Sequence, residues 1–275
     1  MTKLRVGIIG TGQIGKVHVS RYSEIPDVEI VGLCDIRLDE VNRVANQYNV
    51  SYVTPDYHDL LRRDDIDAID VCLHNRLHMP VTVDALEAGK NVYCEKPMSW
   101  TYAESKKMYA TAERTGKKLS IQLGTVFQPE TRAARRLVND GLLGKLYYVK
   151  CYTYRRRNRP FVDGYGTAQF VTKETAGGGT LLDMAIYSLG RMMYLIDAPE
   201  VLTVSGAAYQ ETEMYAERRK SSGYNVEELG IGVVRLAGGM TLFLESSWAI
   251  HGGEPEGDCV MGAKGGVRLD PFTYY

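Results

Sequence analysis

The sequence lacks any long hydrophobic run. Its longest mostly apolar segments, among them Val6–Ile9 and Ala68–Leu73, have the length of a β-strand, and none approaches the roughly 18–20 residues of a membrane-spanning helix. It also lacks an excess of one charge, because 33 basic and 34 acidic residues give a formal net charge of −1. We therefore expect neither a membrane nor a nucleic-acid partner, and favour a small-molecule ligand.

Cysteine is scarce and does not form a motif. The five cysteines are odd in number and show no C-x-x-C spacing: Cys34, Cys72, Cys94, Cys151 and Cys259. We expect reduced, partly buried thiols, and we predict no metal site because no His/Cys/Asp cluster has the spacing of a ligand set. The N-terminus enters a strand pattern at once, which leaves no room for a signal peptide, so we expect a cytoplasmic protein.

The composition that remains is that of an ordinary globular protein. The 275 residues are 44% hydrophobic and 24% charged, which fits one large domain or two small ones. Tyrosine supplies 19 of the 26 aromatic residues. Tyrosine-rich surfaces suit stacking on sugars and suit subunit interfaces equally well, so both interpretations stay open.

The first half of the chain alternates strands with helices. Short β-branched runs predict strands at Leu4–Ile9, Glu29–Cys34, Ala68–Leu73, Asn91–Cys94 and Lys118–Leu123. Helical patterns lie between them at Leu38–Tyr48, Met79–Ala88 and Tyr102–Thr115. This rhythm predicts an α/β domain over residues 1–123, a doubly wound parallel sheet of the Rossmann type.

The second half, residues 124–275, changes rhythm. The patterns predict helices at Pro129–Asn139 and Thr180–Ile196, and strands at Lys145–Tyr154, Val201–Tyr209, Val226–Leu236 and Met240–Ile250. Ala237-Gly238-Gly239 is a hairpin signal between the last two strands. We expect an α+β domain with a mostly antiparallel, open sheet.

A glycine-rich turn joins the first strand to a helix. It has the pattern G-x-G-x-x-G, whose glycines let a pyrophosphate approach the amide groups of a helix N-terminus. Asp35 ends the second strand, where the acid that binds a ribose 2′-hydroxyl belongs. The cofactor contacts predicted from this pattern are Gly10, Gly12, Gln13, Ile14, Gly15 and Asp35. Asp35 favours NAD over NADP, whereas Arg37 could stack on adenine or accept a phosphate.

Two further segments carry candidate chemistry. Glu95-Lys96-Pro97 follows a strand at the carboxyl edge of the parallel sheet, where ligands of such folds bind, and Pro97 restricts the backbone of Lys96. Gly177-Gly178-Gly179 opens the second predicted helix, on which Asp183 and Tyr187 are four residues apart. That spacing puts both side chains on one helix face, about 6 Å apart along the axis.

These motifs together resemble the GFO/IDH/MocA family of oxidoreductases. The resemblance rests on Gly10–Gly15, Asn75–His78 followed by Ala85–Lys90, Glu95–Pro97 and Gly177–Tyr187, and it spans essentially the whole chain. It implies that Lys96 is the catalytic lysine, that Asn75 and Glu95 seat the nicotinamide ribose, and that Asp183 contacts substrate. It also implies that the C-terminal sheet forms a wall of the substrate cleft and a dimer surface.

The sequence departs from the family pattern in two places. Many members have histidine four residues after the aspartate, and this chain has Tyr187, although some relatives use tyrosine there. Free tyrosine has a pKa of about 10 against roughly 6.5 for histidine, so we expect Tyr187 to act as a pair with Lys96. Relatives usually continue beyond the point where this chain stops, so either the sequence is truncated or part of the cleft wall comes from elsewhere.

The predicted reaction is hydride transfer between a secondary alcohol of a sugar, glycoside or cyclic polyol and NAD, with NADP less favoured. The proton would leave toward Tyr187 or Lys96, and the lysine charge would stabilise the developing alkoxide. Two other functions stay open. One is redox-assisted glycoside cleavage with tightly bound NAD, and the other is nucleotide-dependent binding without catalysis. A homodimer or higher homo-oligomer is expected through the C-terminal sheet.

Substrate contacts are predicted from the run of arginines at residues 155–159. Arg155 and Arg157 would bind a polyol, a carboxylate or a phosphate, and a charge-defended edge or interface strand is the alternative. Lys96, Asp183 and Tyr187 complete the predicted substrate contacts. Lys96 and His78 are also counted with the cofactor contacts, although for His74 and His78 structural roles at a helix start are favoured.

Overall fold

The computed structural model describes residues 3–253 and 256–275. The chain divides into two compact units, Met1–Gln122 and Leu123–Tyr275, and each is described by itself. Within the described ranges, no helix combines the length and the apolar character that crossing a bilayer requires.

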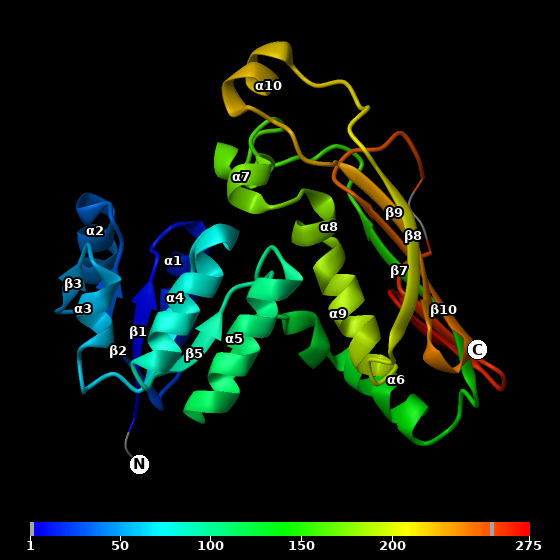
Figure 1. Cartoon of the computed structure of the whole chain (residues 1–275), viewed down its shortest axis with the longest axis horizontal. Helices are drawn as coiled ribbons and strands as arrows, with labels where there is room; N and C mark the ends of the chain where they lie inside the picture. The colour runs from blue at the N-terminus through cyan, green and yellow to red at the C-terminus, as the bar shows by residue number, and fades with distance from the viewer. Residues whose placement is uncertain (1–2, 254–255) are drawn as a thin grey trace. The chain divides into compact units, whose positions relative to one another are not determined.

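The first unit is built on a six-stranded parallel sheet (Figure 1). Its strands are β1 (Leu4–Ile9), β2 (Val28–Cys34), β3 (Val53–Thr54), β4 (Ala68–Val71), β5 (Asn91–Cys94) and β6 (Leu119–Ile121). They lie in the order β3-β2-β1-β4-β5-β6, with every neighbouring pair parallel. The chain order reverses between β1 and β4, and ligands of doubly wound folds bind at that point, beyond the carboxyl ends of the strands.

Helices cover both faces of this sheet. They are α1 (Gln13–Ser23), α2 (Leu38–Tyr48), α3 (Tyr57–Leu61), α4 (Asn75–Glu87) and α5 (Tyr102–Thr115). Alternate residues of β1 separate two cores, because Val6 and Ile8 pack with residues of α1 and α2, whereas Ile9 packs with residues of α3, α4 and α5. The predicted doubly wound parallel sheet is confirmed.

The second unit is built on a seven-stranded sheet. Its strands are β7 (Leu146–Tyr154), β8 (Val201–Tyr209), β9 (Leu229–Leu236), β10 (Met240–Ser247), β11 (Cys259–Gly262), β12 (Gly266–Leu269) and β13 (Phe272–Tyr274). The order is β13-β12-β11-β7-β10-β9-β8, and all pairs are antiparallel except β7 with β10. The predicted hairpin joins β9 to β10 through the short turn η3 (Ala237–Gly239), in which Gly238 and Gly239 have positive φ angles.

Two helices pack on one face of the second sheet (Figure 1). The helical segments of this unit are η1 (Gly124–Phe127), α6 (Pro129–Asn139), η2 (Ala168–Val171), α7 (Lys173–Ala176), α8 (Thr180–Asp183), α9 (Ala185–Leu195) and α10 (Ala216–Ser222). Ala134 of α6 and Met192 of α9 are fully buried against Val149 of β7 and Leu242 of β10. The mostly antiparallel open sheet is therefore confirmed.

Several predicted boundaries differ from the structure. The helix predicted over 180–196 forms as two segments, α8 and α9, separated only by Met184, whose φ of −101° and ψ of −46° stay in the right-handed helical region. The helix predicted from Met79 begins at Asn75, so Pro80 lies inside α4. The pattern also missed the short elements β3, α3 and α10 and the three C-terminal strands, all of which are too short for periodicity to identify.

Candidate active site

The three glycines of the turn after β1 meet different surroundings. Gly10 has φ +96°, and a Cβ there would lie 2.3 Å from the carbonyl oxygen of Cys72; a Cβ on Gly15 would lie 1.9 Å from the carbonyl oxygen of Gly10. Gly12 differs, since among the described residues no heavy atom comes within 4 Å of its Cβ position. Gly10 and Gly15 thus allow close backbone packing, and Gly12 leaves open space beside the start of α1.

The N-terminus of α1 offers amide donors beside that space. Within the described chain, Gly12 supplies no capping side chain and the first turn holds no acidic residue. The first amides of a helix are left without intrahelical acceptors, and the helix dipole favours an anion there. Gln13, Ile14 and Gly15 form that first turn, so the residues present fit the pyrophosphate of a dinucleotide.

Asp35 lies just beyond β2 and is tied to the glycine turn. Its Oδ2 accepts hydrogen bonds from the backbone N–H of Thr11 at 2.9 Å and from its hydroxyl at 3.1 Å, while Oδ1 accepts from the N–H of Arg37 at 3.0 Å. Burial works to raise the pKa of Asp35, but these hydrogen bonds outweigh it and hold the pKa below the usual value. Asp35 is therefore a fixed carboxylate with lone pairs left for ribose hydroxyls.

We expect Asp35→Asn to raise the Kd for NAD by about 10- to 150-fold, because a hydrogen bond to a charged group contributes roughly 1.5–3 kcal/mol. Titration of NADH fluorescence measures this change. Asp39→Asn is the matched control, since Asp39 is an exposed acid in the first turn of α2. An unchanged Kd in the Asp35 variant would remove Asp35 from the cofactor site.

Lys96 follows β5 directly, at the carboxyl edge of the sheet. Glu95 is buried, and its Oε2 accepts a hydrogen bond from the backbone N–H of Lys96 at 3.1 Å. The Lys96–Pro97 peptide bond is cis, and Lys96 itself is half-buried. The segment is thus held at its main chain and presents its lysine at the edge where ligands of this fold bind.

His78, on α4, contacts the backbone at the same carboxyl edge of the sheet. It is fully buried, and its ring nitrogens lie 2.7 Å from the carbonyl oxygen of Pro97 and 2.9 Å from that of Leu73. Burial lowers its pKa. These contacts connect the chain after β4 to the chain after β5. His74 is the N-cap residue of α4 and Asn75 its first residue, both half-buried, which places Asn75 at the carboxyl end of β4.

One group of metal-type donors occurs among the described residues, formed by His18, Asp70 and Cys72. The Nδ1 of His18 lies 2.7 Å from the Oδ2 of Asp70, which is a hydrogen-bond distance. Burial raises the pKa of the Cys72 thiol well above its usual value. We assign this group to an ion pair because the imidazole nitrogen and the carboxylate oxygen already contact each other directly.

In the second unit, the glycine run before α8 packs closely against the backbone and side chain of Glu227. A Cβ on Gly179 would lie 1.8 Å from the carbonyl oxygen of Glu227. The Oε1 of Glu227 accepts hydrogen bonds from the N–H groups of Gly179 at 2.8 Å and Leu181 at 3.0 Å. This carboxylate therefore occupies the N-terminus of α8, and the glycines serve that close packing.

Asp183 and Tyr187 lie on either side of the break between α8 and α9. The Oδ2 of Asp183 accepts a hydrogen bond at 3.0 Å from the indole N–H of Trp248, a side chain that is fully buried. The backbone N–H of Tyr187 donates to the carbonyl oxygen of Met184 at 3.2 Å, and the carbonyl oxygen of Tyr187 accepts from the hydroxyl of Thr125 at 3.1 Å. The two residues lie four positions apart on adjoining helical segments, and Trp248 orients the aspartate.

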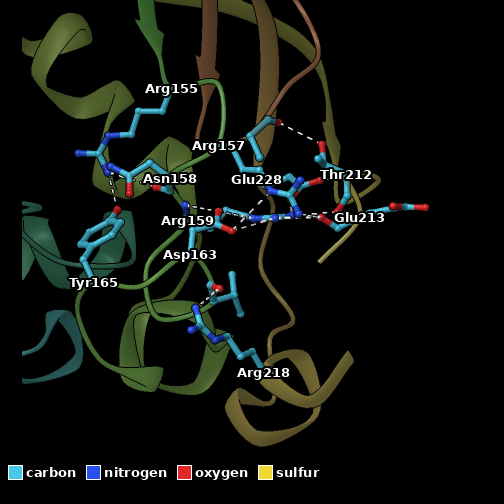
Figure 2. A network of polar contacts seen from close by, with 12 residues as sticks. Arg155, Arg157, Asn158, Arg159, Asp163, Tyr165, Thr212, Glu213, Arg218 and Glu228 are labelled. Carbon is cyan, nitrogen blue, oxygen red and sulfur yellow. Dashed lines mark hydrogen bonds and ion pairs between the residues drawn. The ribbon is translucent and has the colours of Figure 1, made fainter. Parts of the chain in front are cut away.

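The arginine run is held by intramolecular contacts (Figure 2). Arg155 donates to the hydroxyl of Tyr165, and Arg157 donates to the carbonyl oxygen of Glu213 at 3.2 Å. Arg159 is fully buried and forms ion pairs at 2.8 Å with Asp163 and with Glu228. In Figure 2 Arg159 lies among Asp163, Glu228 and Glu213, while Arg155 and Tyr165 form a separate contact. Arg159 thus connects the loop after β7 to the residue preceding β9.

Comparison with known proteins identifies the family. Residues 4–123 match the oxidoreductase family with an NAD-binding Rossmann fold, and residues 131–268 match the GFO/IDH/MocA C-terminal domain. This chain belongs to the GFO/IDH/MocA family. NAD is the cofactor of the family, which agrees with the fit of the glycine turn and Asp35, and the chain is an oxidoreductase with a small-molecule substrate.

Several GFO/IDH/MocA relatives are named by their reactions. The chain is 34% identical to D-glucoside 3-dehydrogenase of Escherichia coli, over 99% of this chain and 78% of that protein. It is 25% identical to myo-inositol 2-dehydrogenase of Thermotoga maritima, over 70% of this chain and 55% of that protein. The crystal structure of aldose-aldose oxidoreductase from Caulobacter crescentus, complexed with glycerol, is 27% identical; the match has a TM-score of 0.79 and covers 96% of this chain and 76% of that one.

Three residues that contact candidate segments of this GFO/IDH/MocA chain were not predicted from the sequence. His18 contacts Glu95, Tyr165 contacts Arg155, and Glu227 holds the start of α8. His18 had one signal in the sequence, because it lies three residues after Gly15 on α1, the helix that follows the glycine turn. Tyr165 and Glu227 carry no local signal, because their partners lie on other elements.

Proposed function

We propose that this oxidoreductase removes hydride from a secondary hydroxyl-bearing carbon of a glucoside or related sugar. The observation that carries the proposal is the 34% identity to D-glucoside 3-dehydrogenase over 99% of the chain, which spans both units. The inositol and aldose oxidoreductase relatives support the same class of substrate, a carbohydrate or cyclic polyol. Within this proposal, residues 1–123 bind the nucleotide and residues 124–275 bind the substrate.

We assign each candidate residue a role in hydride transfer, in proton transfer or in substrate orientation. NAD, when bound, accepts the hydride and its electron pair from the carbinol carbon. The hydroxyl proton passes to the phenolate oxygen of Tyr187 while Lys96 is charged, or to Lys96 as a neutral amine. In both cases the lysine carries a positive charge afterwards, and that charge stabilises the alkoxide character of the substrate oxygen as hydride leaves. Asp183, oriented by Trp248, accepts a hydrogen bond from a substrate hydroxyl. Asn75 and Glu95 seat the nicotinamide ribose, and Arg155 and Arg157 line the path of the sugar.

A substrate screen tests the function. Purified protein is mixed with NAD or NADP and with hexoses, inositols or aryl glucosides, and both NADH formation and sugar products are followed. We expect net NADH with a glucoside and a keto-sugar product, with NAD preferred over NADP. Release of sugar without net NADH would instead identify redox-assisted glycoside cleavage, and NAD binding without turnover of any compound would identify a binding protein.

We also propose a homo-oligomer in the cytoplasm. The face of the second sheet opposite α6 and α9 carries Tyr152, Phe243 and Val233, with the first two rings 5.9 Å apart. The edge strand β8 is exposed along its whole length, with Val204 68% exposed. Apolar surface of this kind supports association with a second copy, and the five free thiols fit a reducing compartment. Light scattering should give a mass of at least two chains, and a monomer mass would contradict the oligomer.

A further inference from the structure

His18 lies between two buried carboxylates of the first unit. Its Nδ1 is 2.7 Å from the Oδ2 of Asp70, and its Nε2 is 2.9 Å from the Oε1 of Glu95. All three side chains are nearly or fully buried. The Nδ1 contact is a hydrogen bond, and the Nε2 contact is an ion-pair distance. A neutral imidazole keeps a lone pair on one ring nitrogen, and that lone pair would face a carboxylate oxygen, so both short contacts favour the imidazolium.

The surroundings of the ring favour that charge. Besides the two carboxylates, the titratable groups around His18 are Tyr22 on its own helix, Cys72 after β4 and Tyr93 on β5. Burial raises the pKa of each of these three groups, so they remain neutral. Burial disfavours the charged ring, but hydrogen bonds with Asp70 and Glu95 outweigh it and raise the pKa of His18 to about 9. The imidazolium places a positive charge within 3 Å of both buried carboxylates.

The ion pair reaches the lysine through Glu95. One oxygen of Glu95 lies against His18, and the other accepts the backbone N–H of Lys96. His18 itself is on α1, whose N-terminus is the glycine turn. Helix α1, strand β4 through Asp70, and the chain after β5 are therefore joined at one ring.

We propose that His18 is a positioning residue, an imidazolium bridge between Asp70 and Glu95 that fixes the main chain at Lys96 relative to the glycine turn. The inference rests on the proposed function of Lys96. The bridge touches no reacting atom, and it acts by holding the peptide that carries the lysine. Displacing a reacting group by about 1 Å can cost on the order of a hundredfold in rate.

The test compares His18→Gln with His58→Gln in the full chain. His58 is the matched control, because its Nδ1 also lies 2.7 Å from a carboxylate, that of Asp56, but its side chain is half-exposed. We expect kcat of the His18 variant to fall about ten- to hundredfold, with a much smaller change in the Kd for NAD, because the glycine turn and Asp35 are untouched. The pH profile of kcat should also change, because the variant has lost the titratable imidazole between the two buried carboxylates. The His58 control should match the wild type in kcat, in the Kd for NAD and in the pH profile of kcat.

Imidazole ¹⁵N NMR of the wild-type protein measures the charge without substrate. His18 should titrate near pH 9, and its midpoint should fall in Asp70→Asn, a variant that keeps the shape of the side chain and serves if His18→Gln does not fold. The amide signal of Lys96 should shift in His18→Gln and stay in place in His58→Gln.

Two results would overturn the inference. One is a ring that titrates near 6.5, and the other is an unchanged kcat and pH profile in a variant that has only lost thermal stability. A wild-type protein that binds NAD and oxidises no carbohydrate would defeat the proposed function instead. The NMR signals would still decide the role of His18 in that case.

Discussion

Replacing Lys96 by Met lowers kcat by about 10²–10⁴-fold, the range that a positioned acid–base group contributes. Methionine keeps the length and packing of the side chain but carries no charge and no proton. The alkoxide that forms as hydride leaves then loses its counter-charge. The Kd for NAD should change little, because the glycine turn and Asp35 supply the main contacts that bind the nucleotide.

Steady-state kinetics with the best glucoside, alongside NADH fluorescence titration, separates these two effects. Lys107→Met is the control, since Lys107 is an exposed lysine of α5, and it should behave as the wild type. A Lys96 variant with near-normal turnover would remove Lys96 from the mechanism. A variant that loses NAD binding as severely as turnover would assign Lys96 to the cofactor site alone.

Replacing Arg159 by Met destabilises the second unit by about 3–5 kcal/mol, the usual effect of removing one partner from a buried ion pair. Asp163 and Glu228 are 8% and 1% exposed, so both carboxylates would be left without their cation inside the protein. The guanidinium also donates to the carbonyl oxygens of Thr212 at 2.9 Å and Glu213 at 3.0 Å, and these bonds would be lost as well (Figure 2).

Urea unfolding followed by circular dichroism measures the change in the free energy of unfolding. Arg157→Met is the matched control from the same run, because its side chain is 48% exposed and its nitrogen lies 3.9 Å from Asp163, and we expect a loss of less than about 1 kcal/mol. Equal losses in the two variants would show that the buried network does not hold the loop.

The sequence predicted the elements whose signals are local. Strands β1 and β5 and helices α2, α5 and α6 begin and end where periodicity and turn residues place them. The nucleotide turn was predictable for the same reason, since its glycines, its helix and Asp35 stand at fixed spacing along the chain.

The break at Met184 had no such signal. Residues 180–196 have a continuous helical pattern, and the interruption depends on partners elsewhere in the chain. Glu227 fixes the start of α8, and Trp248 binds Asp183 at its end. A sequence pattern reports neither contact, so the division into α8 and α9 could not be deduced from it.

The sequence likewise could not predict which side chains of the arginine run are buried. The sequence marked residues 155–159 as a cluster of positive charge, and it offered no means to separate the exposed side chains from the buried one. Burial of Arg159 is decided by Glu228, which lies 69 residues further along the chain. The role of His18 likewise depends on Asp70 and Glu95, which parallel strands bring together from distant positions.

The most direct test of the whole account uses a glucoside that carries deuterium on the carbinol carbon to be oxidised. Incubation with purified protein and NAD, followed by mass spectrometry of the nicotinamide, detects where the label goes. We expect one deuterium in each NADH formed, a slower rate than with the unlabelled glucoside, and loss of both turnover and label transfer in Lys96→Met. Turnover of the glucoside with no deuterium in the nicotinamide would contradict direct hydride transfer from that carbon.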